Sequence, residues 1–121
     1  MYQLERLNIW RAAVELSCEA YGFTLCGPIT QHFDLRNQIR RSAASIPANI
    51  AEGYGLGTQP QMIRCLRISL GSAYELRTHL RLAAYHKLLI AEDLDAVRRC
   101  CDPTIRLITG TLKGLQRMPR G

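Results

Sequence analysis

The sequence predicts an all-α protein, an antiparallel up-and-down four-helix bundle built from a single domain over residues 1–121. Apolar residues recur every three or four positions in four long segments, which is the period of an amphipathic helix. Glycine and proline separate these segments, and no segment shows the alternating pattern of a strand. Short connections make successive helices antiparallel. We expect the helices at about residues 8–26, 34–53, 60–86 and 92–117.

The first helix carries two apolar lines, and Asn8 is suited to cap its N-terminus. One line consists of Leu7, Trp10, Val14, Cys18 and Tyr21, and the other of Ile9, Ala13, Leu16, Ala20 and Phe23. Two such lines predict burial on two sides of the helix. The breakers Gly27 and Pro28 then separate this helix from the next.

The second helix contains the segment QIRRSAASIPANIAEG, residues 38–53, which combines polar residues with a proline. We expect Asp34 to cap this helix and Gly53 to close it as a left-handed residue. Pro47 lacks an N–H group, which costs roughly 3 kcal/mol in a helix interior and predicts a kink. The helix has an apolar stripe of Leu35, Ile39, Ala43, Ile46 and Ile50, and an alanine face of Ala44, Ala48 and Ala51. A polar line of Gln38, Ser42, Ser45, Asn49 and Glu52 has the spacing of a seam that meets another helix.

The third and fourth helices follow the same periodicity. Thr58 or Gln59 is expected to cap the third helix, with Pro60 at its first position. Its core line comprises Met62, Leu66, Ser69, Ala73, Leu76, Leu80 and Ala84, and that of the fourth helix comprises Leu94, Val97, Cys101, Ile105, Ile108, Leu112 and Leu115. Pro103 falls opposite this last line. We therefore expect a kinked but continuous helix, with two shorter helices as the alternative.

The run SIPANIAEG (45–53), followed by a helix that contains ISLGSAYEL (68–76), carries a resemblance to a known family. Over nearly its whole length the chain resembles the small four-helix-bundle proteins first noticed as products of intervening sequences in bacterial 23S ribosomal RNA genes. That family is similar to the accessory variability proteins of diversity-generating retroelements, which work beside a reverse transcriptase. The resemblance implies a homopentamer without catalytic activity, nucleic-acid binding, and a nucleic-acid enzyme as a candidate partner. It implies a structural role for the motif positions Gln38, Arg41, Ser45, Pro47, Asn49, Glu52 and Gly53.

The charge of the chain favours an anionic partner. Sixteen Lys and Arg against ten Asp and Glu give a net charge of +6, and fourteen of the sixteen cations are Arg, whose planar guanidinium suits phosphate. We expect structured RNA or DNA as the partner. The alternative is a protein-binding or scaffolding oligomer whose positive charge is incidental. Self-association is predicted as well, as a closed ring or a symmetric dimer, because the first two helices carry more faces than one bundle buries.

Arginines beside a tyrosine are the candidate nucleic-acid contacts. Guanidinium groups bind phosphates while an aromatic ring stacks on an unpaired base, a combination typical of RNA and single-strand binding. The candidates are Arg36, Arg40 and Arg41 on the second helix, and Arg67, Tyr74, Arg77 and Arg81 on the third. On the fourth helix we interpret Arg99, Arg106, Lys113 and Arg117 as a solvated face.

We expect no catalytic site, metal site or cofactor. The three histidines are far apart in the sequence, and the five cysteines show no CxxC spacing. Gly53, Gly55 and Gly57 precede a helix, but no strand comes before them and no GK[ST] follows. We therefore interpret them as a helix end and linker rather than a phosphate-binding loop. Neither a signal peptide nor a run of about 20 apolar residues is evident, so a cytoplasmic protein outside the membrane is expected.

Overall fold

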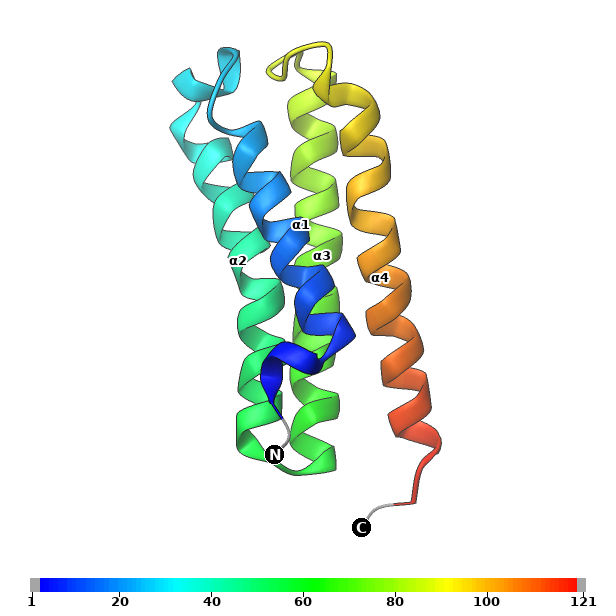
Figure 1. The fold of residues 1–121 in the computed structure, drawn as a ribbon. Helices are drawn as coiled ribbons and strands as arrows, with labels where there is room; N and C mark the ends of the chain where they lie inside the picture. The colour runs from blue at the N-terminus through cyan, green and yellow to red at the C-terminus, as the bar shows by residue number, and fades with distance from the viewer. Residues whose placement is uncertain (1–2, 120–121) are drawn as a thin grey trace.

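The computed structural model describes residues 3–119, and its four long helices run alternately up and down (Figure 1). They are α1 (Asn8–Phe23), α2 (Phe33–Leu56), α3 (Gln59–Tyr85) and α4 (Asp93–Arg117), with two short 3-10 helices, η1 (Leu4–Arg6) and η2 (Pro28–Gln31). No strand occurs between residues 3 and 119. Each helix contacts its neighbours in the chain, and α4 also contacts α1. The predicted all-α four-helix bundle is confirmed.

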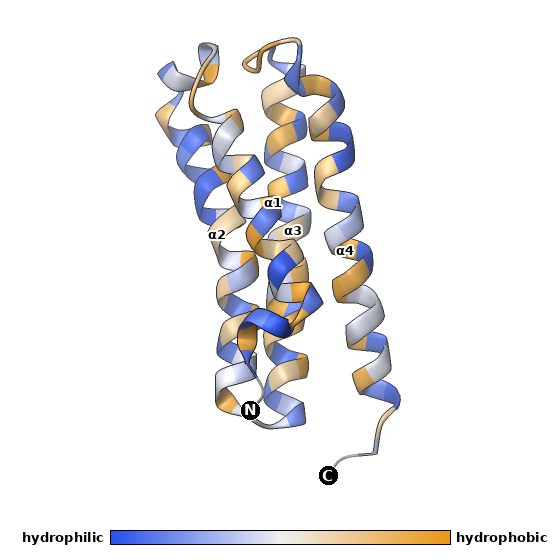
Figure 2. Cartoon of the chain, in the orientation of Figure 1, coloured by the Kyte–Doolittle hydropathy of each residue, from blue (hydrophilic) through white to orange (hydrophobic). Residues whose placement is uncertain are grey.

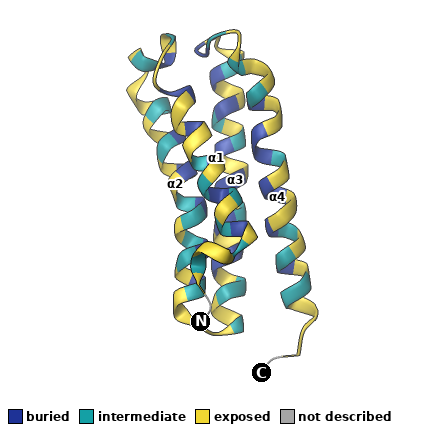
Figure 3. Ribbon diagram, viewed as in Figure 1, coloured by how far each residue is buried: buried dark blue, intermediate teal, exposed yellow. Residues whose placement is uncertain are grey.

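Each helix contributes one inward face to a common core. Apolar and polar residues alternate around the helices, and the buried residues lie on the sides that face one another (Figures 2 and 3). In α1 only one of the two apolar lines is buried, that of Ile9, Ala13, Leu16, Ala20 and Phe23. The other line is half-buried at Leu7, Trp10 and Val14 and exposed at Cys18 and Tyr21. Burial of α1 on two sides is therefore not achieved within a single chain.

The polar line of α2 meets α3, the arrangement that its spacing predicted. The Ser45 and Ser72 hydroxyls lie 2.8 Å apart, and Asn49 Nδ2 donates to Ser45 O at 2.8 Å. Nearby, the buried Ser69 hydroxyl donates to Ile46 O at 2.9 Å. These bonds satisfy polar groups that would be costly to bury unpaired.

Two of the three predicted helix caps differ from the structure, and the third, Thr58, is confirmed. Asn8 is not a cap but the first residue of α1, and its Oδ1 instead accepts a hydrogen bond from the Arg11 guanidinium. Asp34 is likewise not a cap but the second residue of α2, whose N-cap residue is His32. Its carboxylate is stabilised there by the positive end of the helix dipole. Thr58 is the N-cap of α3, and its hydroxyl accepts a hydrogen bond from the Gln61 N–H.

Gly53 does not close α2. The helix continues to Leu56, and Gly57 takes the left-handed conformation at its end, with φ of 81°. Gly53 is instead buried where α2 packs closely on α3. A Cβ atom at this position would lie 2.7 Å from Met62 Sδ and 3.0 Å from Cys65 Cβ. The glycine is thus needed for helix–helix contact rather than for helix termination.

The two prolines predicted to kink a helix, Pro47 and Pro103, both lie inside continuous helices. Pro47 occurs within α2 and Pro103 within α4, so the alternative of two shorter C-terminal helices is wrong. Pro103 is exposed, which agrees with its predicted place opposite the apolar line. The two kinks stay a prediction.

Candidate nucleic-acid interface

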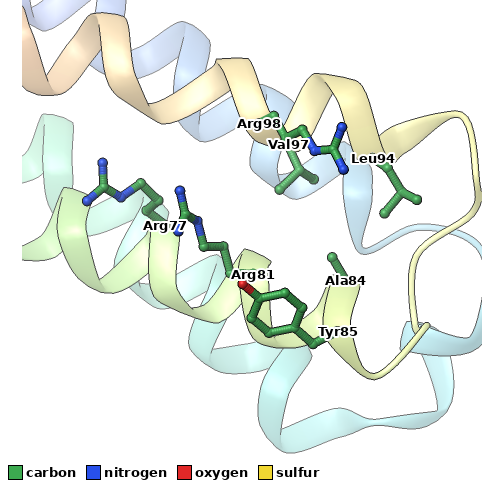
Figure 4. Close-up of a pocket in the computed structure, with 7 residues that line it drawn as sticks. All are labelled: Arg77, Arg81, Ala84, Tyr85, Leu94, Val97 and Arg98. Atoms are coloured by element: carbon green, nitrogen blue, oxygen red, sulfur yellow. The ribbon is translucent and has the colours of Figure 1, made fainter.

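A groove of about 420 Å³ lies between the C-terminal half of α3 and the first turns of α4 (Figure 4). Residues one helical turn apart point the same way, so each helix presents a short row of side chains to the groove. The lining residues are Arg77, Arg81, Ala84 and Tyr85 from α3, and Leu94, Val97 and Arg98 from α4. This groove brings together two of the predicted contact residues, Arg77 and Arg81, with a third arginine from α4.

The three arginines differ in how far their charge is neutralised. Arg77 Nη1 lies 2.9 Å from Asp102 Oδ1, and Arg98 Nη1 lies 3.5 Å from Asp95 Oδ1. Arg81 is exposed and forms neither a hydrogen bond nor an ion pair with the residues that the structure describes. The Arg98 pair is largely exposed on both sides, at 78% and 76%, so water screens it and an incoming anion can replace the carboxylate. Arg81 and Arg98 are therefore the cations most open to a phosphate.

The aromatic ring open to this groove is Tyr85 rather than the predicted Tyr74. The guanidinium of Arg77 lies over the Tyr74 ring, 4.9 Å from its centroid, and covers one face of the ring. Tyr85 is the last residue of α3 and is 75% exposed, against 45% for Tyr74. Sequence reasoning missed Tyr85, although its spacing of four from Arg81 placed it on the same side of the helix.

The predicted arginines of α2 lie elsewhere. Since α2 and α4 are on opposite sides of the bundle, the side chains of α2 do not join the α3–α4 groove (Figure 1). Arg40 Nε donates to Thr24 Oγ1 at 2.8 Å, and its guanidinium lies 4.2 Å from the centroid of Tyr21. Arg40 thus connects α2 to the C-terminal end of α1.

The remaining predicted arginines are separate from one another. Arg36 stacks on Phe33 at 4.8 Å, and its buried Nε finds no hydrogen-bond partner within residues 3–119. Arg41 is exposed on α2. Arg67 lies near the start of α3, where it lines a different recess against the C-terminal end of α4. The seven predicted contact residues therefore do not form one continuous surface.

Several of the family-motif positions lie where α2 packs on α3. The Ser42 hydroxyl donates to the Gln38 carbonyl at 2.8 Å. Glu52 Oε2 lies 3.6 Å from Arg64 Nη2 and 3.9 Å from Cys65 Sγ, so the carboxylate reaches the neighbouring helix. Together with the Ser45–Ser72 bond and the close approach at Gly53, this contact places Ser45, Glu52 and Gly53 at the α2–α3 packing surface rather than in the groove, whereas Gln38 and Arg41 are exposed.

The reactive side chains outside the groove are scattered. Cys100 Sγ and Cys101 Sγ lie 3.7 Å apart, and their mutual hydrogen bond is the main cause that raises the pKa of Cys100 and lowers that of Cys101. His79 Nε2 lies 3.3 Å from Glu75 Oε2. Among residues 3–119, no three His, Cys, Asp or Glu side chains gather as a metal site would require, and no helix there is apolar and long enough to cross a membrane.

Comparison with known proteins identifies relatives of the chain. The family model of the 23S rRNA-intervening sequence protein matches residues 5–110. A solved structure of a protein of unknown function from the S23 ribosomal protein family of Bacteroides thetaiotaomicron is similar, with a TM-score of 0.76 and 23% sequence identity. The alignment covers 87% of this chain and 98% of that one, and at this identity it supports the fold alone. No curated protein matches the chain.

Proposed function

Because the chain belongs to the family of 23S rRNA-intervening sequence proteins, we propose that it is a non-catalytic, homo-oligomeric bundle that binds RNA or DNA. It would act as an accessory to a nucleic-acid process, beside a nucleic-acid enzyme. The observation that carries the proposal is the α3–α4 groove, where Arg81, unpaired within residues 3–119, lies with Arg77, Arg98 and an exposed tyrosine. Guanidinium groups and an aromatic ring are the two chemistries that nucleic-acid recognition uses most.

The net charge supports this partner. Each chain carries +6, so a pentamer would carry +30, five times that value. A surface of this sign attracts the phosphate backbone without reading its sequence, and the attraction weakens steeply with salt. Since Asp102 and Asp95 partly neutralise two of the groove arginines, we expect a modest salt dependence for each groove.

A non-catalytic role agrees with how the polar side chains are used. Ser45 and Ser72 bond each other, and Ser69 bonds a backbone carbonyl, so these hydroxyls serve the packing of α2 on α3. Cys65 is fully buried between the same two helices. The serines are engaged in these bonds, and burial denies Cys65 the access to a substrate that nucleophilic catalysis needs, although the Glu52 carboxylate lies 3.9 Å from its sulfur.

Self-association is supported by the faces that one chain leaves uncovered. The second apolar line of α1 is only half-buried or exposed, and Ala44 and Ala48 of α2 are exposed. Small side chains allow the backbone of a neighbouring subunit to come close. We propose a closed ring of five subunits. Light scattering at micromolar protein concentration measures the oligomeric state, and a monomer would contradict this proposal.

A reducing compartment such as the cytoplasm suits the exposed free thiols of Cys18 and Cys26.

Titration of labelled RNA and DNA at several salt concentrations tests nucleic-acid binding. We expect affinity to fall linearly on a log–log plot as salt rises, with a slope of about −0.7 for each phosphate neutralised on a single strand. Arg81→Ala should reduce the magnitude of the slope by about 0.7, because it removes one unpaired cation. Arg99→Ala is the matched control, since Arg99 lies on the opposite, α1-facing groove of α4. Absence of binding at low salt would contradict the proposed function.

A further inference from the structure

Tyr85 has an unusual position for a tyrosine in a small bundle. Its side chain is 75% exposed, more than any other large apolar residue described, and it ends α3 at the rim of the α3–α4 groove. In Figure 4 the ring lies along α3 with its hydroxyl end on the side of Arg81. Burial of an exposed aromatic ring is a strong source of binding energy, so a ring held at a groove in this way is suited to a flat ligand.

The walls of the groove are apolar where they approach this ring. Leu94 and Val97 project from α4 towards α3, and Ala84 lies beside Tyr85 on the facing helix (Figure 4). The volume of about 420 Å³ falls within the roughly 300–1,000 Å³ of small-ligand sites. Phosphate binding alone would make no contact with this apolar recess. A purine or pyrimidine base, which is flat and weakly polar, fits it better.

Cations flank the recess at the spacing of successive helical turns. Arg81 lies one turn before Tyr85 on α3, and Arg98 lies one turn after Leu94 on α4. Arg81 has no anionic partner among the described residues, and the Asp95–Arg98 pair is mostly solvated. Both guanidinium groups can therefore donate hydrogen bonds to the phosphates on either side of a base that occupies the recess.

Resting on the proposed function, we infer that this groove binds an unpaired nucleotide, with the base on Tyr85 and the flanking phosphates on Arg81 and Arg98. The protein then prefers single-stranded RNA or DNA to a duplex. In a duplex the bases are stacked and paired, so exposing one ring face to Tyr85 requires unstacking at a cost of a few kcal/mol. A single strand offers its bases at little cost.

The test compares unstructured single strands with blunt-ended duplexes of two annealed strands that have the same total number of nucleotides, in both RNA and DNA forms, by fluorescence anisotropy at one fixed salt concentration. Wild-type protein should bind the single strands more tightly. Tyr85→Ala should weaken single-strand binding by about 5- to 150-fold, the loss expected for one base–aromatic stack. Tyr85→Phe, which keeps the ring, should retain single-strand affinity. Because the side chain is exposed, both variants should keep the wild-type circular dichroism spectrum.

The outcomes separate this inference from the proposed function. Equal or tighter binding of the duplex by wild-type protein overturns the inference and leaves nucleic-acid binding in place. The same conclusion follows if Tyr85→Ala weakens both forms equally or leaves both unchanged. If neither form binds at low salt, the proposed function itself fails. A difference between the RNA and DNA single strands identifies which of the two is the preferred ligand.

Discussion

Gly53→Ala is the substitution whose effect the structure defines most sharply. Alanine normally stabilises a helix interior relative to glycine by about 1 kcal/mol, because glycine loses more backbone freedom on folding. At position 53 the added methyl group has no room. It would lie 2.7 Å from Met62 Sδ, 3.0 Å from Cys65 Cβ and 3.2 Å from Met62 Cα. The steric and entropic effects therefore have opposite signs.

We expect the steric cost of Gly53→Ala to exceed its entropic gain. The Met62 sulfur can swing away, but Cys65 Cβ and Met62 Cα move only if α3 itself shifts by a few tenths of an ångström. Forcing an extra methyl group into a well-packed site typically costs about 1–3 kcal/mol. After the helical gain of about 1 kcal/mol is subtracted, we expect a net loss of up to about 2 kcal/mol in the free energy of unfolding.

Gly110→Ala provides the matched control. Gly110 is helical like Gly53, but it is exposed, and a Cβ atom there would meet nothing within 4 Å. This variant should be more stable than wild type by about 0.5–1 kcal/mol. Urea unfolding followed by far-UV circular dichroism measures both changes. If Gly53→Ala stabilises the protein as much as Gly110→Ala does, the close packing of α2 on α3 at this point is refuted.

Two further predictions concern the ion pair beside the groove and the cysteines. A double-mutant cycle with Arg77→Ala and Asp102→Ala should give a coupling of about 0.2–1 kcal/mol, because both side chains are more than a third exposed and water screens the pair; a coupling well above this range would show that the pair is shielded from solvent. In the native protein an aromatic disulfide reagent should modify Cys18 and Cys26 readily, and the three buried cysteines only after denaturation. Rapid reaction of all five thiols under native conditions would contradict the buried positions.

The sequence predicted the helices and their inward faces because periodicity reports burial directly. The line from Ile9 to Phe23 is buried throughout, and Thr58 caps α3 as its side chain suggested. The end of α2 could not be predicted in the same way. Gly53 and Gly57 are both glycines near a helix end, and only the position of α3 decides which one needs space and which one needs a positive φ.

The candidate site was predicted in part. Periodicity placed Arg77 and Arg81 on one flank of α3, but it could not show where the side chains of α4 meet them. The contact between Arg77 and Asp102 joins residues on different helices, and it holds the guanidinium over Tyr74. A lone tyrosine at the end of a helix gave no sign of its exposure. Tyr85 became a candidate only through the three-dimensional arrangement.

The hydrogen bonds between α2 and α3 also determine the axial register of the two helices. Sliding α3 by one turn, about 5.4 Å, would separate Ser45 from Ser72 and Ser69 from the Ile46 carbonyl, and would leave buried polar groups without partners. Apolar contacts alone discriminate less sharply against a slip of two turns, since Leu66, Ala73 and Leu80, spaced seven residues apart, are all apolar. The serines therefore fix the height of each arginine of α3 along the bundle, and with it the distance between basic groups that a bound strand would meet.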